Sequence, residues 1–260
     1  MPNRILPTGK RPPKGRMSDF SFLVYGPPGI GKTTWANAFP EALFLATESG
    51  TELMEAASVE IGSWADFLAV QDALRGREDH DFRTIVVDTI DLLYPLCIQA
   101  TCEELGITDP ADAEWGRGWR ALKNRWINAI HGLRTLKTPS GSPMCVVFVS
   151  HERSQPIKER RGRKEVETGR FYISSDLPGS ARDVLHSAVD FILHAEMNED
   201  GQRVLRTQPA KTPTADIEAK GRGTPTNRLP DLVPMDFRAF AEAFAAAFNN
   251  RNNEEKNDDV

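Results

Sequence analysis

The sequence of 260 residues contains only three cysteines, no long hydrophobic run and no excess of positive charge. Cys97, Cys102 and Cys145 have spacings that suit neither a disulfide framework nor a zinc site. No apolar run approaches the roughly 20 residues of a membrane helix, and the polar N-terminus lacks the apolar segment of a secretory signal. These absences predict a protein that has no membrane segment and works in a reducing, cytoplasmic compartment.

Charge is unevenly placed along the chain. The formal net charge is −5, so any contact with nucleic acid has to come from a local basic surface. Residues 1–16 carry five cations and no acid, whereas the tail from Asn249 is rich in Asn, Asp and Glu. We therefore expect a basic flexible leader over 1–17, one domain over 18–248 and a disordered polar tail over 249–260.

The order of apolar and amphipathic segments predicts an α/β fold, because their alternation is typical of a mostly parallel sheet flanked by helices. Strands are expected at about 20–25, 42–47, 84–88, 144–150, 189–196 and 203–208, and the main helices at about 63–75, 89–106, 114–137, 179–188 and 235–248. The polar stretch 152–175 is expected to be a loop. In the helix at 114–137, apolar residues recur at spacings of three and four, which favours core packing over base stacking. These residues are Trp119, Leu122, Trp126, Ile130 and Leu133.

Residues 26–33 complete the phosphate-binding pattern G-x-x-x-x-G-K-[ST], directly after an expected strand and before a helix. Its glycines let backbone N–H groups converge on the phosphates of a nucleotide, and the helix N-terminus adds its positive end. Lys32 is predicted to reach the β- and γ-phosphates, and the Thr33 hydroxyl to hold Mg²⁺. The predicted nucleotide-binding residues are Gly26, Pro27, Pro28, Gly29, Ile30, Gly31, Lys32, Thr33 and Thr34.

Polar residues at the ends of the expected strands suit the hydrolysis of a triphosphate. Asp88 is predicted to hold Mg²⁺ directly or through water. The next residue, Thr89, cannot act as a base, so we expect Glu48, at the end of a strand beside the phosphate loop, to activate water, with Asp91 as the alternative. His151 is predicted to contact the γ-phosphate and to report its loss, although a structural histidine is the simpler alternative.

Two basic segments are candidates for contacts with phosphates outside the loop. In the expected loop at 152–175, cations suit a DNA backbone contact that ATP switches, while a solvated charged loop is the alternative. Lys220 and Arg222 flank a glycine and are predicted to reach a phosphate in a neighbouring subunit, unless they form an ordinary basic turn. The predicted DNA-binding residues are Lys158, Arg160, Arg161, Arg163 and Lys164.

Taken together, these motifs resemble those of phage RecA-like P-loop ATPases, and more narrowly those of phage nucleotide-binding proteins that act as single-strand annealing recombinases. The resemblance implies a RecA-like core that uses ATP and Mg²⁺ and assembles with itself into a ring or filament on single-stranded DNA in the host cytoplasm. It also implies a possible link to a single-strand-binding protein and ATP sites shared between subunits. The near half of each site would hold Lys32, Thr33, Glu48 and Asp88, and the far half Lys220 and Arg222.

Two other classes stay open. The first is an AAA+-like remodelling or loader ATPase that acts on a protein partner. Such ATPases have similar phosphate-loop sequences, but they require an acid after Asp88 and a helical lid. A P-loop kinase for a small molecule needs a lid that carries arginine, for which only 152–170 is available. The leading prediction is a DNA-stimulated ATPase that promotes strand annealing in phage-type homologous recombination.

Overall fold

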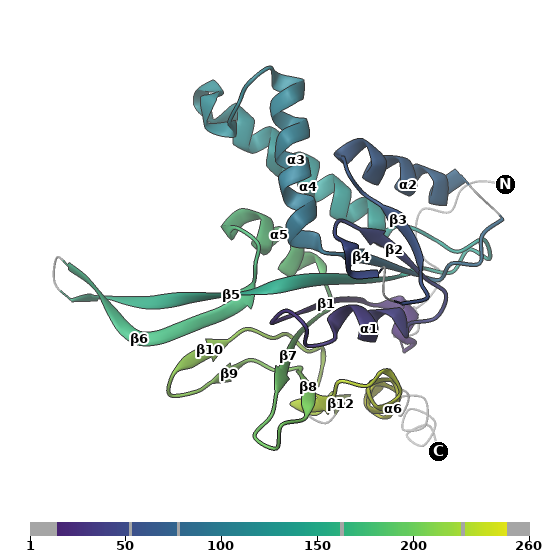
Figure 1. The fold of residues 1–260 in the computed structure, drawn as a ribbon, viewed down its shortest axis with the longest axis vertical. Coiled ribbons are helices and arrows are strands. Elements are labelled where there is room, and N and C mark those ends of the chain that lie inside the picture. Colours follow the sequence, from purple (N-terminus) through teal and green to yellow (C-terminus); the bar gives the residue numbers. More distant parts are fainter. Residues whose placement is uncertain (1–14, 52–53, 77–78, 162–163, 225–226, 249–260) are drawn as a thin grey trace, which may run out of the picture.

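A mostly parallel sheet runs through the protein, with helices on both of its faces (Figure 1). The computed structural model describes residues 15–51, 54–76, 79–161, 164–224 and 227–248. Most of the predicted leader, all of the predicted tail and Arg163 therefore lie outside the described residues. The helices are α1 (Lys32–Asn37), α2 (Trp64–Gly76), α3 (Ile90–Leu105), α4 (Arg117–Arg134), α5 (Gly179–Ala188) and α6 (Phe237–Phe248).

The order of the strands brings the ends of β1, β5 and β4 together. The main path runs β13-β8-β7-β1-β5-β4-β2-β3, and all neighbours from β7 to β3 are parallel. The predicted α/β fold with a mostly parallel sheet is thus confirmed. The strands of this path are β1 (Ser21–Gly26), β2 (Ala42–Ala46), β3 (Ala57–Glu60), β4 (Thr84–Asp88), β5 (Cys145–Arg161), β7 (Phe191–Met197), β8 (Arg203–Arg206) and β13 (Leu232–Pro234).

Five short or peripheral strands lie outside this path. Strand β6 pairs with β5 and β10, β9 pairs with β10, and β11 pairs with β12. Their bounds are β6 (Lys164–Ser175), β9 (Ala210–Lys211), β10 (Ala215–Ile217), β11 (Gly223–Thr224) and β12 (Asn227–Arg228). Among the described residues, no helix is both long and apolar enough to cross a membrane.

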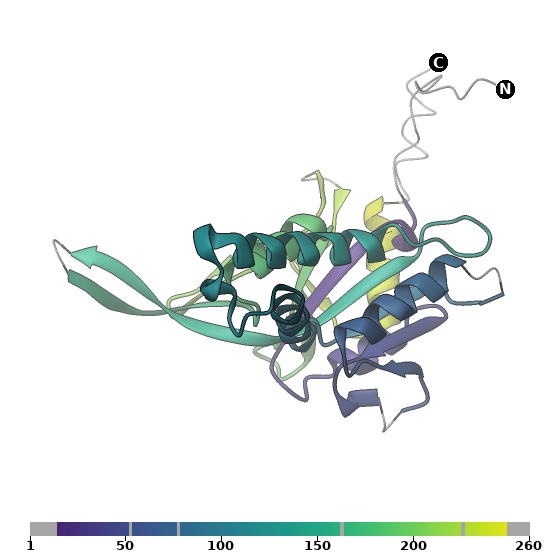
Figure 2. The ribbon, with the colours of Figure 1, turned by 90° about the horizontal axis from the view of Figure 1, so that it is seen from above.

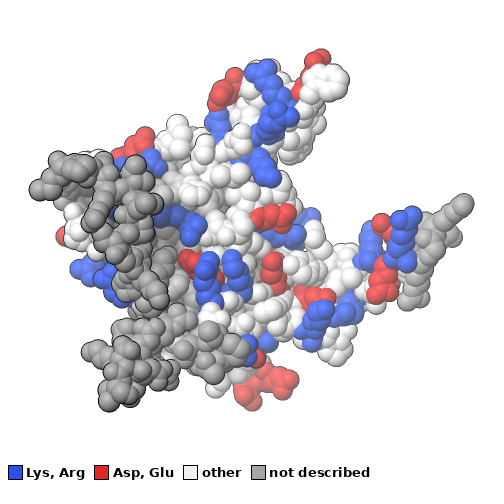
Figure 3. Space-filling model, turned by 180° about the vertical axis from the view of Figure 1, so that it is seen from behind, with Lys and Arg blue, Asp and Glu red and all other residues white. Residues whose placement is uncertain are grey.

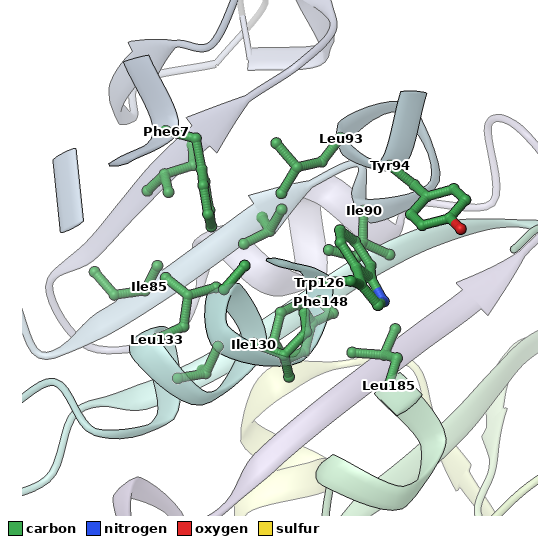
Figure 4. Close-up of a cluster of buried hydrophobic side chains, with 14 of the residues drawn as sticks. Phe67, Ile85, Ile90, Leu93, Tyr94, Trp126, Ile130, Leu133, Phe148 and Leu185 are labelled. Carbon is green, nitrogen blue, oxygen red and sulfur yellow. The ribbon is translucent and has the colours of Figure 1, made fainter. Parts of the chain in front are cut away.

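Alternate residues of the central strands feed two separate cores. In β1, Leu23 and Tyr25 face the core under α2, α3, α4 and α5, whereas Phe22 and Val24 face the core under α1 and α6. Figure 4 shows the first core, to which α4 contributes Trp126 and β5 contributes Phe148. Because both faces are buried, these strands carry continuous apolar runs.

Helix α6 seals the second core with phenylalanines three or four residues apart. Phe240 and Phe244 are buried, and their rings meet Phe22 of β1 with centroids 5.8 and 6.2 Å apart. Such edge-to-face contacts add to the stabilisation that comes from burying the ring surface. The predicted final helix at 235–248 therefore holds the sheet from the side opposite α4 (Figure 2).

The stretch 152–175 forms a long antiparallel hairpin, and its prediction as a loop was wrong. Strand β5 continues past the sheet and pairs with β6 from Glu152↔Ser175 to Arg161↔Lys164, with a register shift between Pro156 and Lys158. We call this hairpin the arm, and it reaches away from the body of the protein (Figures 1 and 2). Its two strands satisfy each other's backbone groups, so it needs no apolar periodicity to form.

One residue of the predicted apolar stripe does not belong to the core. Leu122, Trp126, Ile130 and Leu133 are buried as predicted, but the side chain of Trp119 is 50% exposed. Trp119 lies in the first turn of α4, where the helix projects beyond the layer that covers the sheet. A periodic pattern indicates which face of a helix is apolar, but not where along the helix the core ends.

Trp126 and Trp119 form a matched pair for a test of this division. Trp126→Ala should lower the free energy of unfolding by about 3–5 kcal/mol, because it removes a buried ring whose Nε1 donates to the carbonyl of Ala181. Trp119→Ala should change it by about 0.5 kcal/mol or less. Urea unfolding followed by circular dichroism measures both, and equal losses would contradict the assignment.

Candidate nucleotide-binding site

The phosphate-binding pattern lies between β1 and α1, at the edge of the sheet where the parallel strands end. Gly26 is in close contact with β7, because a Cβ at this position would lie 2.4 Å from the carbonyl oxygen of Ala195. Gly29 and Gly31 have φ values of +74° and +104°, in the left-handed region that favours glycine. The glycines of the pattern are therefore required by packing and by backbone conformation.

Lys32 is buried and holds the loop in its closed turn. Its Nζ donates to the carbonyl oxygens of Gly26, at 2.8 Å, and Pro27, at 3.0 Å. Burial lowers the pKa of Lys32, and the nearby carboxylates of Asp88 and Asp91 partly offset this shift. A buried ammonium bound only to neutral carbonyls is well placed to bind an anion at the same loop.

Asp88 is the most strongly perturbed carboxyl group of the site. It is 1% exposed, and neither of its carboxylate oxygens accepts a hydrogen bond of good geometry from a described residue, although the nearby Thr33 hydroxyl stabilises its charged form. Burial raises the pKa of Asp88 to about 6, and Glu48 adds to this shift, whereas the Thr33 hydroxyl and Lys32 oppose it. The Thr33 hydroxyl and the Asp88 carboxylate both border Gly50, where an added Cβ would lie 3.7 Å from Thr33 Oγ1 and 3.9 Å from Asp88 Oδ2.

These groups fit a magnesium ion that a nucleotide helps to hold. The buried Asp88 carboxylate without a partner and the adjacent Thr33 hydroxyl supply hard oxygen ligands. Among the described residues, no group of three or more His, Cys, Asp or Glu side chains could hold a metal by itself. Magnesium bound by one or two protein oxygens together with phosphates and water agrees with both observations.

His151 connects two carboxylates at the same edge. It pairs with Gly26 across β1 and β5, so it lies directly beside the start of the loop. Its backbone N–H donates to Asp91 Oδ1 at 3.0 Å, and its Nδ1 lies 2.8 Å from Asp91 Oδ2. Its Nε2 lies 3.9 Å from Glu48 Oε2. Asp91 is thus committed to orienting His151, while Glu48 remains one-third exposed.

Glu48 reaches the site by a route that differs from the predicted one. Its strand, β2, was expected beside β1, but β5 and β4 lie between them. The backbone N–H of Thr47 donates to the carbonyl of Asp88, and the Thr47 hydroxyl receives a hydrogen bond from the N–H of Thr89. These bonds join the ends of β2 and β4, so the segment after β2 turns toward the loop. The predicted residues Lys32, Thr33, Glu48, Asp88, Asp91 and His151 therefore lie together.

A second ionic network, which no sequence motif marked, flanks the loop on its other side. His194 of β7 is buried, with Nε2 2.8 Å from Glu152 and Nδ1 2.9 Å from Glu196. Burial lowers the pKa of His194, but the hydrogen bonds with both glutamates outweigh it, and the net shift is upward. Arg206 of β8 in turn donates to both carboxylate oxygens of Glu196. Only the pairing of β1 with β7 brings this network next to Tyr25 and the loop.

Lys220 and Arg222 lie at the opposite edge of the sheet. Lys220 Nζ donates to the carbonyls of His186 and Val189, at the end of α5. Arg222 is half exposed and pairs with Asp190 at 2.9 Å. The Asp190 carboxylate accepts from the N–H of Ser21, where β1 begins. The length of β1, roughly 17 Å at 3.3 Å per residue, therefore separates both cations from the loop of their own subunit.

The predicted DNA-binding residues that are described lie on the arm, where two of them have acids opposite and the other two, Arg161 and Lys164, pair with each other. Lys158 pairs with Glu167, and Arg160 pairs with Glu165, in the β5–β6 register. Figure 3 shows Lys and Arg side chains interleaved with Asp and Glu along the arm. The arm is therefore mixed in charge along its described length, not uniformly basic.

A glycine loop between a strand and a helix, a buried lysine and a buried aspartate at the end of a parallel strand define a P-loop ATPase domain. The chain belongs to the family described as AAA domain, which matches residues 18–222. No curated protein matches the sequence.

Two solved structures match part of this chain. A crystal structure of the RadB recombinase has 16% sequence identity and a TM-score of 0.39, covering 73% of this chain and 80% of that chain. A prototypical ATPase from the type III secretion system of pathogenic bacteria has 10% identity and a TM-score of 0.43, covering 70% of this chain. This chain spans 52% of the length of that ATPase.

Because the Asp88 carboxylate is buried, we predict that its charge lowers the stability of the folded protein. In the protein without nucleotide and magnesium, Asp88→Asn should raise the free energy of unfolding by about 1–3 kcal/mol at pH 7.5. The reason is that burial raises the pKa of Asp88 from the ordinary 3.8 to about 6, so that at pH 7.5 the folded wild-type protein carries a charge that its buried position disfavours. The gain should shrink as the pH falls through this window, because the wild-type carboxyl group then becomes neutral.

Urea unfolding at a series of pH values measures this effect. Asp91→Asn is the matched control, since Asp91 accepts two hydrogen bonds from His151; the same substitution there should lower stability. An Asp88→Asn variant that is less stable than the wild type at pH 7.5 would contradict the proposed cost.

Proposed function

We propose that the protein is an ATPase that hydrolyses Mg²⁺-bound ATP at the loop and acts on single-stranded DNA in homologous recombination or strand annealing of the phage type. The proposal of ATP hydrolysis rests on one observation, which is that Lys32, Asp88 and Glu48 lie together at one edge of the sheet. Both Asp88 and Glu48 act electrostatically on the buried ammonium of Lys32. The three groups suit phosphate binding, metal binding and activation of water, respectively.

Glu48 is the best general base among Asp88, Asp91 and Glu48. Asp88 is buried without a partner and is assigned to magnesium. Asp91 is held by two hydrogen bonds from His151. Glu48 is one-third exposed, has His151 Nε2 3.9 Å away, and can therefore accept a proton from water. His151, positioned by Asp91 beside the loop, is the proposed sensor of the γ-phosphate.

Glu48→Gln should leave Mg²⁺-ATP binding within about twofold and lower turnover by about 100-fold or more, because the amide cannot accept the proton. Fluorescent-nucleotide titration and phosphate release measure the two properties. Glu60→Gln is the control: Glu60 is exposed on β3, and its backbone pairs with Ala46, near the same strand end. Turnover that survives in Glu48→Gln would remove Glu48 from the base role.

The continuity of β5 supports a link between the nucleotide and the arm. The strand pairs with β1 up to His151 and then continues without interruption into the arm. A change at the γ-phosphate would therefore act on the first residue of the segment that presents Lys158 and Arg160. Backbone contacts to single-stranded DNA by such cations are electrostatic and independent of sequence.

Assembly of several copies would complete the site. We propose that Arg222, which is half exposed at the edge opposite the loop, reaches the nucleotide of a neighbouring subunit after it exchanges Asp190 for phosphate. Lys220, whose ammonium already has two carbonyl partners in its own chain, would support the segment that carries Arg222. Ring or filament assembly follows from this arrangement, because each copy would contribute to its neighbour's site.

A second candidate function is an AAA-type ATPase that acts on a protein partner. The family match favours this class, and so do two exposed tryptophans where α4 projects from the body. Trp115 is 93% exposed and Trp119 is 50% exposed. Exposed tryptophans are enriched in protein interfaces because they bury a large apolar area.

Single-stranded DNA should raise the rate of ATP turnover several-fold at about 50 mM salt, with much less effect at about 200 mM, because phosphate contacts release counterions. The double substitution Lys158→Ala/Arg160→Ala should remove most of the stimulation and leave the basal rate unchanged. Arg120→Ala/Lys123→Ala, on exposed positions of α4, is the matched control. If DNA neither binds nor stimulates the wild-type protein, the second candidate function replaces the first.

A further inference from the structure

A guanidinium group lies against the phosphate loop. Arg203 is the first residue of β8, and a Cβ placed on Gly31 would lie 3.3 Å from Arg203 Nη1. Gly31 directly precedes Lys32 in the loop. The contact joins segments far apart in the sequence, and no motif points to Arg203.

The backbone of Arg203 is held on both sides. It pairs with Met197 across β7 and β8, and its carbonyl accepts a hydrogen bond from the N–H of Met235 at 2.9 Å. The turn before it is closed by the Asn198 side chain, which accepts from the N–H of Gln202 at 2.8 Å. The position of Arg203 beside the loop is therefore set by paired strands and a hydrogen-bonded turn.

Within the described part of the chain, the Arg203 side chain has no counter-charge. It is exposed, and no carboxylate among the described residues forms an ion pair with it. Arg206, at the other end of the same strand, is by contrast bound to Glu196 through Nε and Nη2. The fork of donors on a guanidinium suits phosphate oxygens. An uncompensated guanidinium beside a phosphate loop is thus arranged for an anion that binds there.

The strand order places this arginine away from the hydrolytic groups. Strands β7 and β8 lie on one side of β1, whereas β5, β4 and β2, which position His151, Asp88 and Glu48, lie on the other (Figure 1). We propose that Arg203 binds the part of the polyphosphate that ATP and ADP share, and that it takes no part in cleaving the γ-phosphate. This inference rests on the proposed nucleotide site, but not on any action on DNA.

Arg203→Ala should weaken the binding of Mg²⁺-ATP and of Mg²⁺-ADP by the same factor, about 10-fold, because each loses a charge-assisted hydrogen bond. The turnover at saturating ATP should stay within about twofold of the wild-type value. Arg203→Lys should restore part of the affinity, since it keeps the charge but not the fork. Titration with fluorescent ATP and ADP analogues and steady-state kinetics give these quantities.

Two controls separate the possible failures. Arg238→Ala, at an exposed arginine of α6 that pairs with Glu242, should leave both affinities unchanged. Lys32→Ala should abolish binding, and if the wild-type protein binds neither nucleotide, the proposed site itself fails. Unchanged affinity in a folded Arg203→Ala protein would overturn the role of Arg203 alone. A loss for ATP without an equal loss for ADP, or a fall in turnover at saturation, would also overturn it. Arg203→Gln replaces the alanine variant if the latter does not fold.

Discussion

The burial of two opposite charges at one edge of the sheet is the constraint on which the site depends. The ammonium of Lys32 and the carboxylate of Asp88 are both removed from water, but they do not neutralise each other by direct contact. Lys32 is held by loop carbonyls, and Asp88 has no hydrogen-bond partner among the described residues. Each charge is therefore better stabilised by a ligand of the opposite sign than by the protein, and a magnesium–phosphate pair supplies both signs.

The second feature that shapes the protein is the length of β5. Its first half is a central, buried strand between β1 and β4, and its second half is the exposed arm. His151 lies where these halves meet, fixed by Asp91 at the ring and at the backbone. On the next residue, Glu152 pairs with buried His194 and so joins the arm to β7. Polar networks thus hold the junction on both sides of the strand, and they relate the loop to the arm by contiguous contacts.

Several elements could be read from the sequence because local composition and burial agree there. The runs at β1, β4 and the start of β5 are apolar on both faces, and their burial follows directly. The arm could not be predicted, because its strands pair with each other and present polar side chains on both faces. Strand β3 is short and fully exposed at the edge of the sheet, so no periodic pattern distinguishes it from a loop. Trp119 fits the stripe of α4, but it lies where the helix has left the core.

The sequence by itself determined the phosphate loop and the residue types at the strand ends, because glycine spacing and the alternation of strand and helix are local properties of the chain. Only the tertiary structure decided which of these residues meet. It placed β5 and β4 between β1 and β2, the strand that precedes Glu48, and it bound Asp91 to His151. It also set Lys220 and Arg222 at the far edge and brought Arg203 to the loop. Strand order and side-chain pairing arise from contacts between distant segments, which no local pattern in the chain encodes.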